Sequence, residues 1–322
     1  MSGPSAADGD RGQARAVFLG SGSFAVPILE VLAAAPEVEL VGVVTAPARK
    51  AGRRGDVRPT PVAVASSGLG VPVLTPERLR APDSIAAILA VRPSLAVLAD
   101  YGQIVPPPLL ELPHGALNLH PSLLPRHRGA SPIPAAILAD DRETGVTLMR
   151  MDAGLDTGPI VAADRWRLHG TETAPAMEER AAGAAARLLA RSLGPWLRGE
   201  LPETPQDETT ATLTRPLRRE DGRLDPDRPA AELARRVRAF QPWPGTYLEI
   251  DDLRLVVLAA RVAPGAPEDR TGLLTLDESG LALATGSGRL VLDRVQPAGG
   301  RPMSGAELVR GRPALVGRAV RA

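Results

Sequence analysis

The chain has 322 residues, 44% hydrophobic and 23% charged, a composition typical of a folded protein of about two domains, which excludes wholesale disorder. The 38 basic and 37 acidic side chains give a net charge of +1, which excludes a surface that is basic all over but allows a local basic patch. The absence of cysteine excludes a disulfide framework, a thiolate metal site and a catalytic thiol. No apolar run approaches the ~18 residues that span a bilayer, so we expect a cytoplasmic protein.

Residues 1–14 are small and polar and lack the basic-then-apolar order of a signal peptide, so we expect a flexible leader. Beyond them, short apolar runs alternate with segments of helical spacing. The predicted strands are Ala16–Leu19, Leu40–Thr45, Val71–Leu74, Leu95–Ala99 and Ala116–His120, and the helices between them are Phe24–Ala35, Thr60–Ser67 and Asp83–Val91. This alternation predicts βαβ units around a parallel sheet.

The same pattern continues with elements of both kinds. A helix is predicted at Ile133–Ala139, strands at Val146–Met151 and Ile160–Trp166, and a long helix at Pro175–Leu193. We therefore predict a Rossmann-like α/β domain over residues 15–197.

Composition changes at residues 198–214, which are polar, rich in proline and threonine and typical of a linker. A helix follows at Ala230–Phe240, and then short alternating strands separated by turn residues. These strands are Tyr247–Ile250, Leu253–Ala260, Gly272–Leu276, Leu281–Ala284 and Leu290–Val295. The spacing predicts a small β-barrel domain over residues 215–322, and this part of the chain resembles an OB-type barrel.

The turn after the first strand is rich in glycine. Gly20-Ser-Gly22-Ser-Phe24-Ala25 fits the G-x-G-x-x-G/A pattern of dinucleotide-binding proteins. Such proteins also place an acidic residue at the end of the second strand, where this chain has Val44-Thr45. The pattern therefore favours an architectural turn over a dinucleotide site.

The fifth strand carries the side chains best suited to chemistry. Asn118 and His120 are two residues apart and so project from the same face of that strand. An amide can donate to a developing oxyanion, and an imidazole can donate a hydrogen bond or move a proton near neutral pH. A carboxylate on the loop after the next strand could orient this histidine; we favour Asp156, although spacing does not rank it above Asp152.

Three histidines, His114, His120 and His127, are the only candidates for a metal site near this strand. Neither an H-E-x-x-H pattern nor a Cys/His cluster occurs, so we expect no metal. The serine-hydrolase and P-loop signatures are missing as well.

Two segments together resemble the signature of the 10-formyltetrahydrofolate-dependent formyltransferases. They are Asn118-Leu-His120-Pro-Ser122-Leu123-Leu124-Pro125 and Met151-Asp-Ala-Gly-Leu-Asp156-Thr-Gly158, and the likeness extends over residues 15–310. The resemblance implies that Asn118, His120 and Asp156 are catalytic. It also implies that Ser122, Leu123, Leu124 and Pro125 line the folate site. One departure is His127, where relatives usually carry an aromatic residue.

Within this family, the resemblance implies transfer of a formyl group from 10-formyltetrahydrofolate to the methionine of initiator methionyl-tRNA. We expect a monomer, because the surface that faces the tRNA must stay accessible. Members that act on glycinamide ribonucleotide would end near residue 200. Members that act on a nucleotide-linked amino sugar can carry a similar tail, so this alternative stays open. A non-catalytic protein that binds a dinucleotide or RNA would not need Asn118, His120 and Asp156 together.

A tRNA substrate should be met by concentrated positive charge in spite of the near-zero net charge. Arg49, Lys50, Arg53 and Arg54 lie in a glycine-containing segment, residues 49–58, that we expect to be a flexible tRNA-binding loop. Trp243 lies between Pro242 and Pro244 and could stack on a base, but the rigid corner favours a packing role.

Overall fold

The computed structural model describes residues 13–51 and 56–321. Among these residues, one seven-stranded sheet has the order β10-β9-β7-β6-β1-β2-β5. Its strands are β1 (Ala14–Gly20), β2 (Val38–Val44), β5 (Val73–Leu74), β6 (Leu95–Ala99), β7 (Ala116–His120), β9 (Glu143–Arg150) and β10 (Ile160–Arg167). Pairing is parallel from β5 through β7, whereas β9 runs antiparallel to β7. The predicted α/β class with a mostly parallel sheet is confirmed, and the antiparallel strand β9 is added beside β7.

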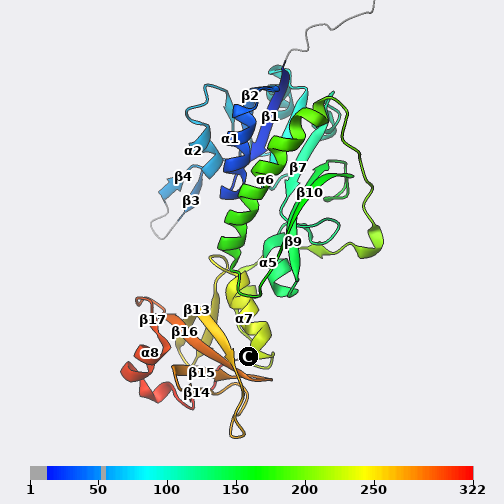
Figure 1. Cartoon of the computed structure of the whole chain (residues 1–322). Helices are drawn as coiled ribbons and strands as arrows, with labels where there is room; N and C mark the ends of the chain where they lie inside the picture. The colour runs from blue at the N-terminus through cyan, green and yellow to red at the C-terminus, as the bar shows by residue number, and fades with distance from the viewer. Residues whose placement is uncertain (1–12, 52–55, 322) are drawn as a thin grey trace, which may run out of the picture. The chain divides into compact units, whose positions relative to one another are not determined.

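Burial explains why these strands form. The last five residues of β1 and all five of β6 are buried, as expected for strands covered on both faces of a parallel sheet. The helices before residue 198 are α1 (Val26–Ala34), α2 (Pro61–Ser66), α3 (Pro82–Ala90), α4 (Pro107–Leu110), α5 (Pro132–Leu138) and α6 (Ala174–Leu197). Helix α1 lies beside β2 (Figure 1). The described part of the chain contains no helix that is long and apolar enough to cross a membrane.

The glycine-rich turn has an architectural role. A Cβ on Gly22 would lie 1.9 Å from a carboxylate oxygen of Asp100, and one on Gly20 would lie 2.8 Å from the carbonyl oxygen of Ala99. The amide of Ser21 donates to the carbonyl oxygen of Asp100 at 3.0 Å. The glycines therefore let this turn pack directly on the end of β6.

The C-terminal part is built around an antiparallel sheet with the order β12-β13-β16-β15-β14, with β17 paired to β16. Its strands are β12 (Thr246–Ile250), β13 (Leu253–Ala263), β14 (Leu274–Asp277), β15 (Gly280–Ala284), β16 (Arg289–Pro297) and β17 (Met303–Ser304). Helix α7 (Ala230–Ala239) packs against β13 and β16 (Figure 1), and Leu233 and Val237 join the strands in one core. The predicted β-rich second half is confirmed.

Some short elements in the described residues were not expected, among them helix α8 and the strands of the basic segment. Helix α8 (Gly305–Gly311) begins with a capping box in which Ser304 and Glu307 each bond the other's backbone amide. The basic segment forms two short strands, β3 (Arg49–Ala51) and β4 (Asp56–Arg58), paired as an antiparallel hairpin. The prediction of a flexible loop was therefore wrong for residues 49–51 and 56–58, and residues 52–55 are not among those that the structure describes.

Two compact units divide the chain. The first contains the residues up to Pro125, Gly145–Asp164 and Ala181–Thr210, and the second contains Arg126–Thr144, Arg165–Arg180 and the residues from Ala211. The segment predicted as a linker bonds within both units. Thr204 pairs with Ile160 in the first unit, and β11 (Leu213–Thr214) pairs with β8 (Arg128–Gly129) in the second. The domain boundaries at residues 197 and 215 remain predictions.

Candidate active site

The site is built at the carboxyl end of β7, in the first unit. His120 is the last residue of this strand and is 4% exposed, while Asn118 is half-buried on the same face. Strand β7 lies between β6 and β9, so main-chain hydrogen bonds on both sides hold it in place. Two polar side chains are thus presented by a rigid element at the sheet edge where α/β proteins commonly bind ligands.

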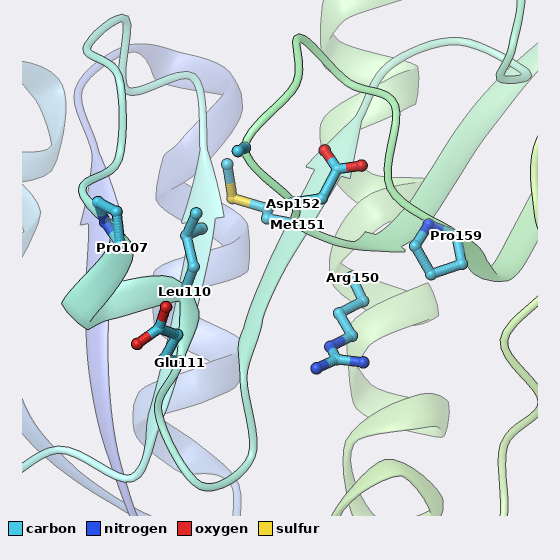
Figure 2. Close-up of a pocket in the computed structure, with 8 residues that line it drawn as sticks. Pro107, Leu110, Glu111, Arg150, Met151, Asp152 and Pro159 are labelled. Carbon is cyan, nitrogen blue, oxygen red and sulfur yellow. The ribbon is translucent and has the colours of Figure 1, made fainter.

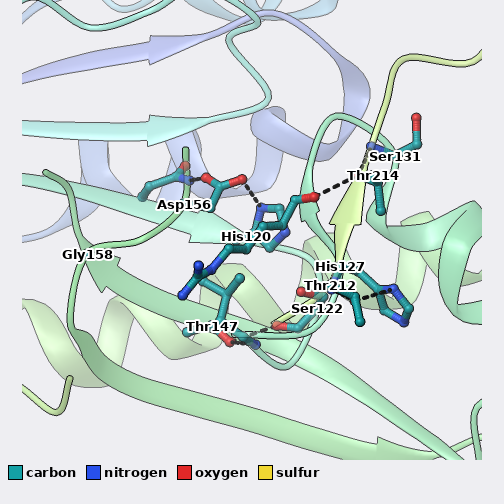
Figure 3. A network of polar contacts seen from close by, with 12 residues as sticks. His120, Ser122, His127, Ser131, Thr147, Asp156, Gly158, Thr212 and Thr214 are labelled. Atoms are coloured by element: carbon teal, nitrogen blue, oxygen red, sulfur yellow. Dashed lines mark hydrogen bonds and ion pairs between the residues drawn. The ribbon is translucent and has the colours of Figure 1, made fainter. Parts of the chain in front are cut away.

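Asp156 connects these two side chains (Figure 3). Its Oδ2 lies 3.7 Å from His120 Nδ1, an ion pair when the imidazole is protonated, and its Oδ1 accepts a hydrogen bond from Asn118 Nδ2 at 3.5 Å. The Asp156 side chain is only 12% exposed. The structure therefore brings together the three residues predicted as catalytic. Such a carboxylate can hold the imidazole in one orientation.

Asp152, the alternative carboxylate, forms hydrogen bonds within its own loop. Its Oδ1 accepts hydrogen bonds from the amide of Gly154 at 2.9 Å and from the hydroxyl of Thr157 at 2.7 Å. This pattern closes a local turn of the kind that aspartate often stabilises. Geometry thus separates two carboxylates that spacing could not rank.

The conformation of the Asp156 loop is unusual for its sequence. Asp156 has a φ of +53°, in the left-handed region that non-glycine residues seldom adopt. A Cβ on Gly158 would lie 1.9 Å from the carbonyl oxygen of Arg150, so only glycine fits there. Gln206, which the sequence prediction placed in a linker, donates to the carbonyl oxygens of Asp156 and Gly158. No local sequence signal pointed to this glutamine.

The four residues predicted to line the folate site form a firmly held loop after β7. Thr147, on β9, donates its hydroxyl to the carbonyl oxygen of Ser122 at 2.7 Å and accepts from the amide of Leu124 at 3.1 Å. Ser122 is fully buried and Leu124 is 7% exposed, whereas Leu123 is half-buried. Pro125 follows Leu124 through a cis peptide bond. Thr147 is a supporting residue that the sequence prediction missed.

A cavity of about 420 Å³ opens beside the loop that carries Asp156 (Figure 2). It is lined by Pro107, Leu110, Glu111, Arg150, Met151, Asp152, Ala153 and Pro159. Its walls combine apolar side chains with a few charged groups, as is common in sites for small organic ligands. Across the described residues, no cluster of three or more histidine, aspartate or glutamate side chains could hold a metal ion.

His127, the departure from the family pattern, is held within the second unit. It is 7% exposed, and its Nε2 lies 2.7 Å from Asp141 Oδ2. Its backbone amide donates to the hydroxyl of Thr212 at 2.8 Å. The residue therefore packs with a carboxylate as its polar partner.

Only some of the residues predicted to contact tRNA are among those that the structure describes. Arg49 and Lys50 are on β3, with Arg49 exposed, whereas Arg53 and Arg54 lie outside the described residues. Trp243 is 52% exposed, with the Arg219 guanidinium 5.8 Å from the centre of its ring. The expectation that Trp243 is a packing residue was therefore wrong.

Comparison with known proteins agrees with this geometry. Residues 14–193 match the model of the formyl transferase family, and residues 216–313 match the model of the formyl transferase C-terminal domain. A protein of Halorhodospira halophila is 43% identical over 309 residues, which cover 95% of this chain and 99% of that protein. A protein of Roseiflexus sp. is 44% identical over 299 residues, 92% of each chain. Both relatives carry the name methionyl-tRNA formyltransferase.

Solved structures with low sequence identity share the fold. The N-formyltransferase of Helicobacter canadensis, in complex with folinic acid and dTDP-3-aminofucose, gives a TM-score of 0.63 at 15% identity, over 86% of this chain and 98% of that one. HypX of Aquifex aeolicus gives 0.62 at 16% identity over 92% of this chain, which spans about half of HypX (49%). The two family models and the similarity to full-length relatives show that the chain belongs to the formyl transferase family.

Proposed function

We propose that this protein transfers the formyl group of 10-formyltetrahydrofolate to the α-amino group of methionine on initiator tRNA, for translation initiation. The observation that carries the proposal is the single carboxylate, Asp156, in contact with both Asn118 and His120. Methionyl-tRNA as the acceptor is supported by relatives of that name at 43% and 44% identity over nearly their whole length. We propose that it acts as a monomer in the cytoplasm.

The three side chains have separate roles in this proposal. The neutral amine attacks the formyl carbon, and the new C–N bond forms as negative charge develops on the formyl oxygen. Asn118 and protonated His120 donate hydrogen bonds to that oxygen, and Asp156 stabilises the imidazolium. As the bond from carbon to N10 breaks, Asp156 relays the proton lost by the amine to N10. The products are the formylated amine and tetrahydrofolate.

The formyl donor needs a shaped, rigid site. The loop Ser122–Pro125, fixed to β9 through Thr147, offers main-chain groups and the apolar side chains of Leu123 and Leu124. A folate-bound HypX structure shares this fold, at a TM-score of 0.61 and 17% identity, over 92% of this chain and 47% of HypX. These features support the folate assignment.

The tRNA would be met by the basic segment, through Arg49, Lys50, Arg53 and Arg54. Arginine and lysine bind phosphates without regard to sequence, and this supplies much of the affinity for nucleic acids. The exposed position of Arg49 supports its assignment.

The test is to incubate the protein with 10-formyltetrahydrofolate and charged initiator tRNA and to detect formylmethionine. The Asn118→Ala and His120→Ala variants should each lose ~10²–10³ in kcat, because each loses one donor to the oxyanion. Thermal unfolding of the variants controls for folding. A parallel reaction contains a nucleotide-linked amino sugar instead of tRNA. Formylation of the sugar alone, or near-normal kcat in both variants, would overturn the assignment.

A further inference from the structure

The segment that follows α6 runs beside the start of β10 in the first unit. Ile160 and Thr204 exchange both main-chain hydrogen bonds, each at 2.8 Å. Next to this pair, Arg150 and Glu203 form an exposed ion pair at 3.2 Å. Residues 203–206 are therefore attached at one end to the two strands that flank the Asp156 loop.

Gln206 completes the attachment at the other end. Its Nε2 donates to the carbonyl oxygen of Asp156 at 2.8 Å and to that of Gly158 at 2.7 Å, and the residue is half-buried. One amide nitrogen carries two N–H groups, so it can serve both carbonyls at once. Glutamate, of the same shape, would place a carboxylate oxygen against the same two acceptors.

One of these two carbonyls belongs to Asp156 itself, the residue that matters most for the geometry of the site. Asp156 has a left-handed backbone, which costs free energy and persists only where its surroundings hold it. Its carboxylate is 3.7 Å from His120 Nδ1 and 3.5 Å from Asn118 Nδ2, at the outer limit of useful contact. A small rotation of its backbone would break one contact or the other.

We infer that Gln206 is a positioning residue that fixes Asp156 through the backbone of its loop. This inference rests on the proposed function of Asp156. Its place of action is the chemical step, because its amide bonds the loop backbone and leaves the surfaces proposed for folate and tRNA unchanged. Loss of the two hydrogen bonds should therefore lower kcat and leave the KM values for both substrates nearly unchanged.

The experiment compares Gln206→Leu and Gln206→Glu with Glu203→Gln, a matched control that removes only the exposed ion pair of the same segment. We expect both Gln206 variants to lose ~10- to 100-fold in kcat, since misplacement of a reacting group by about 1 Å can cost ~10². Glu203→Gln should keep the activity of the unmodified protein. Equal kcat in all three variants, or a loss confined to KM, would overturn the inference.

A double variant separates positioning from a general structural role. If Gln206 acts through Asp156, the Gln206→Leu change should cost little kcat in an Asp156→Asn background. A full loss in that background would show that Gln206 acts by another route and would overturn the inference.

Hydrogen exchange gives a readout that does not need the activity. Gln206→Leu should speed exchange of the amides at 154–158 and leave strand β7 protected, and unchanged exchange in the loop would also overturn the inference. If the unmodified protein formylates no substrate, the proposed function fails by itself, while this measurement still decides whether Gln206 holds the loop.

Discussion

Tyr101 places an ionisable hydroxyl within the apolar core of the first unit. The residue is 7% exposed and packs in a cluster with Leu98, Val105 and Leu109. Within the described residues its hydroxyl has no hydrogen-bond partner, and burial raises the pKa of Tyr101 to about 12. The folded protein therefore holds this proton more tightly than the unfolded chain does.

The sign of the effect on stability follows from that difference. Because the unfolded chain loses the proton first, the stability that Tyr101 contributes is full below about pH 10 and is lost as the pH rises toward about 12. Tyr101→Phe removes the ionisable group, so the variant should lose less stability than the unmodified protein over this window. Urea unfolding at pH 8, 10 and 11 measures the free energy of unfolding of both proteins. Parallel declines in the two proteins would contradict the prediction.

Single residues also mark how far the sequence could predict the site. Asn118, His120 and Asp156 were predicted from strand periodicity and from the family resemblance, and the structure brings them together. Asp152 could not be set aside, because the hydrogen bonds that distinguish it depend on the folded loop. Gln206 could not be predicted, since it bonds main-chain atoms about fifty residues away, and main-chain acceptors leave no mark in a sequence.

Strand β9 holds the loop that follows its neighbour β7 through the side chain of Thr147. Thr147→Val removes the hydroxyl that bonds the backbone of Ser122 and Leu124. We expect a loss of about 1–3 kcal/mol in the free energy of unfolding, the usual cost when buried polar groups lose partners. We also expect a raised KM for the formyl donor, because the loop proposed to line its site loosens.

The control for this prediction is Thr144→Val, a buried threonine of the same strand that does not bond the 122–124 loop. Urea unfolding and steady-state kinetics with varied donor concentration give the two measurements. If Thr147→Val left the KM for the formyl donor unchanged, this loop would not be part of the folate site.

Among the elements, those with strong apolar patterns were predicted and those fixed by other parts of the chain were not. Strands β1 and β6 are buried runs whose hydrophobicity is visible in the sequence. The direction of β9 was not visible, because apolar content does not encode the polarity of a strand. The hairpin β3–β4 escaped prediction because its strands are three residues each and carry exposed charges.

For the molecule as a whole, the net charge of +1 conceals where the positive charge lies. The basic segment has five cations, Arg49, Lys50, Arg53, Arg54 and Arg58, against one acidic residue, Asp56. Each phosphate contact releases a bound counterion, so binding to tRNA should weaken as salt rises, with a log–log slope of roughly −0.7 to −0.9 per contact. Affinity for initiator tRNA should therefore fall steeply between 50 and 200 mM salt.

Substitution in the basic segment should change this slope and not only the affinity. Arg49→Ala removes one exposed cation of β3 and should reduce the slope by about one phosphate contact, equally for charged and uncharged tRNA, because phosphate binding does not read the amino acid. Arg80→Ala, at an exposed arginine outside the segment, is the matched control. Fluorescence anisotropy with labelled tRNA at four salt concentrations gives the slopes. Equal salt slopes for Arg49→Ala and Arg80→Ala would show that tRNA does not bind at the hairpin, because a basic residue changes the slope only where it contacts a phosphate.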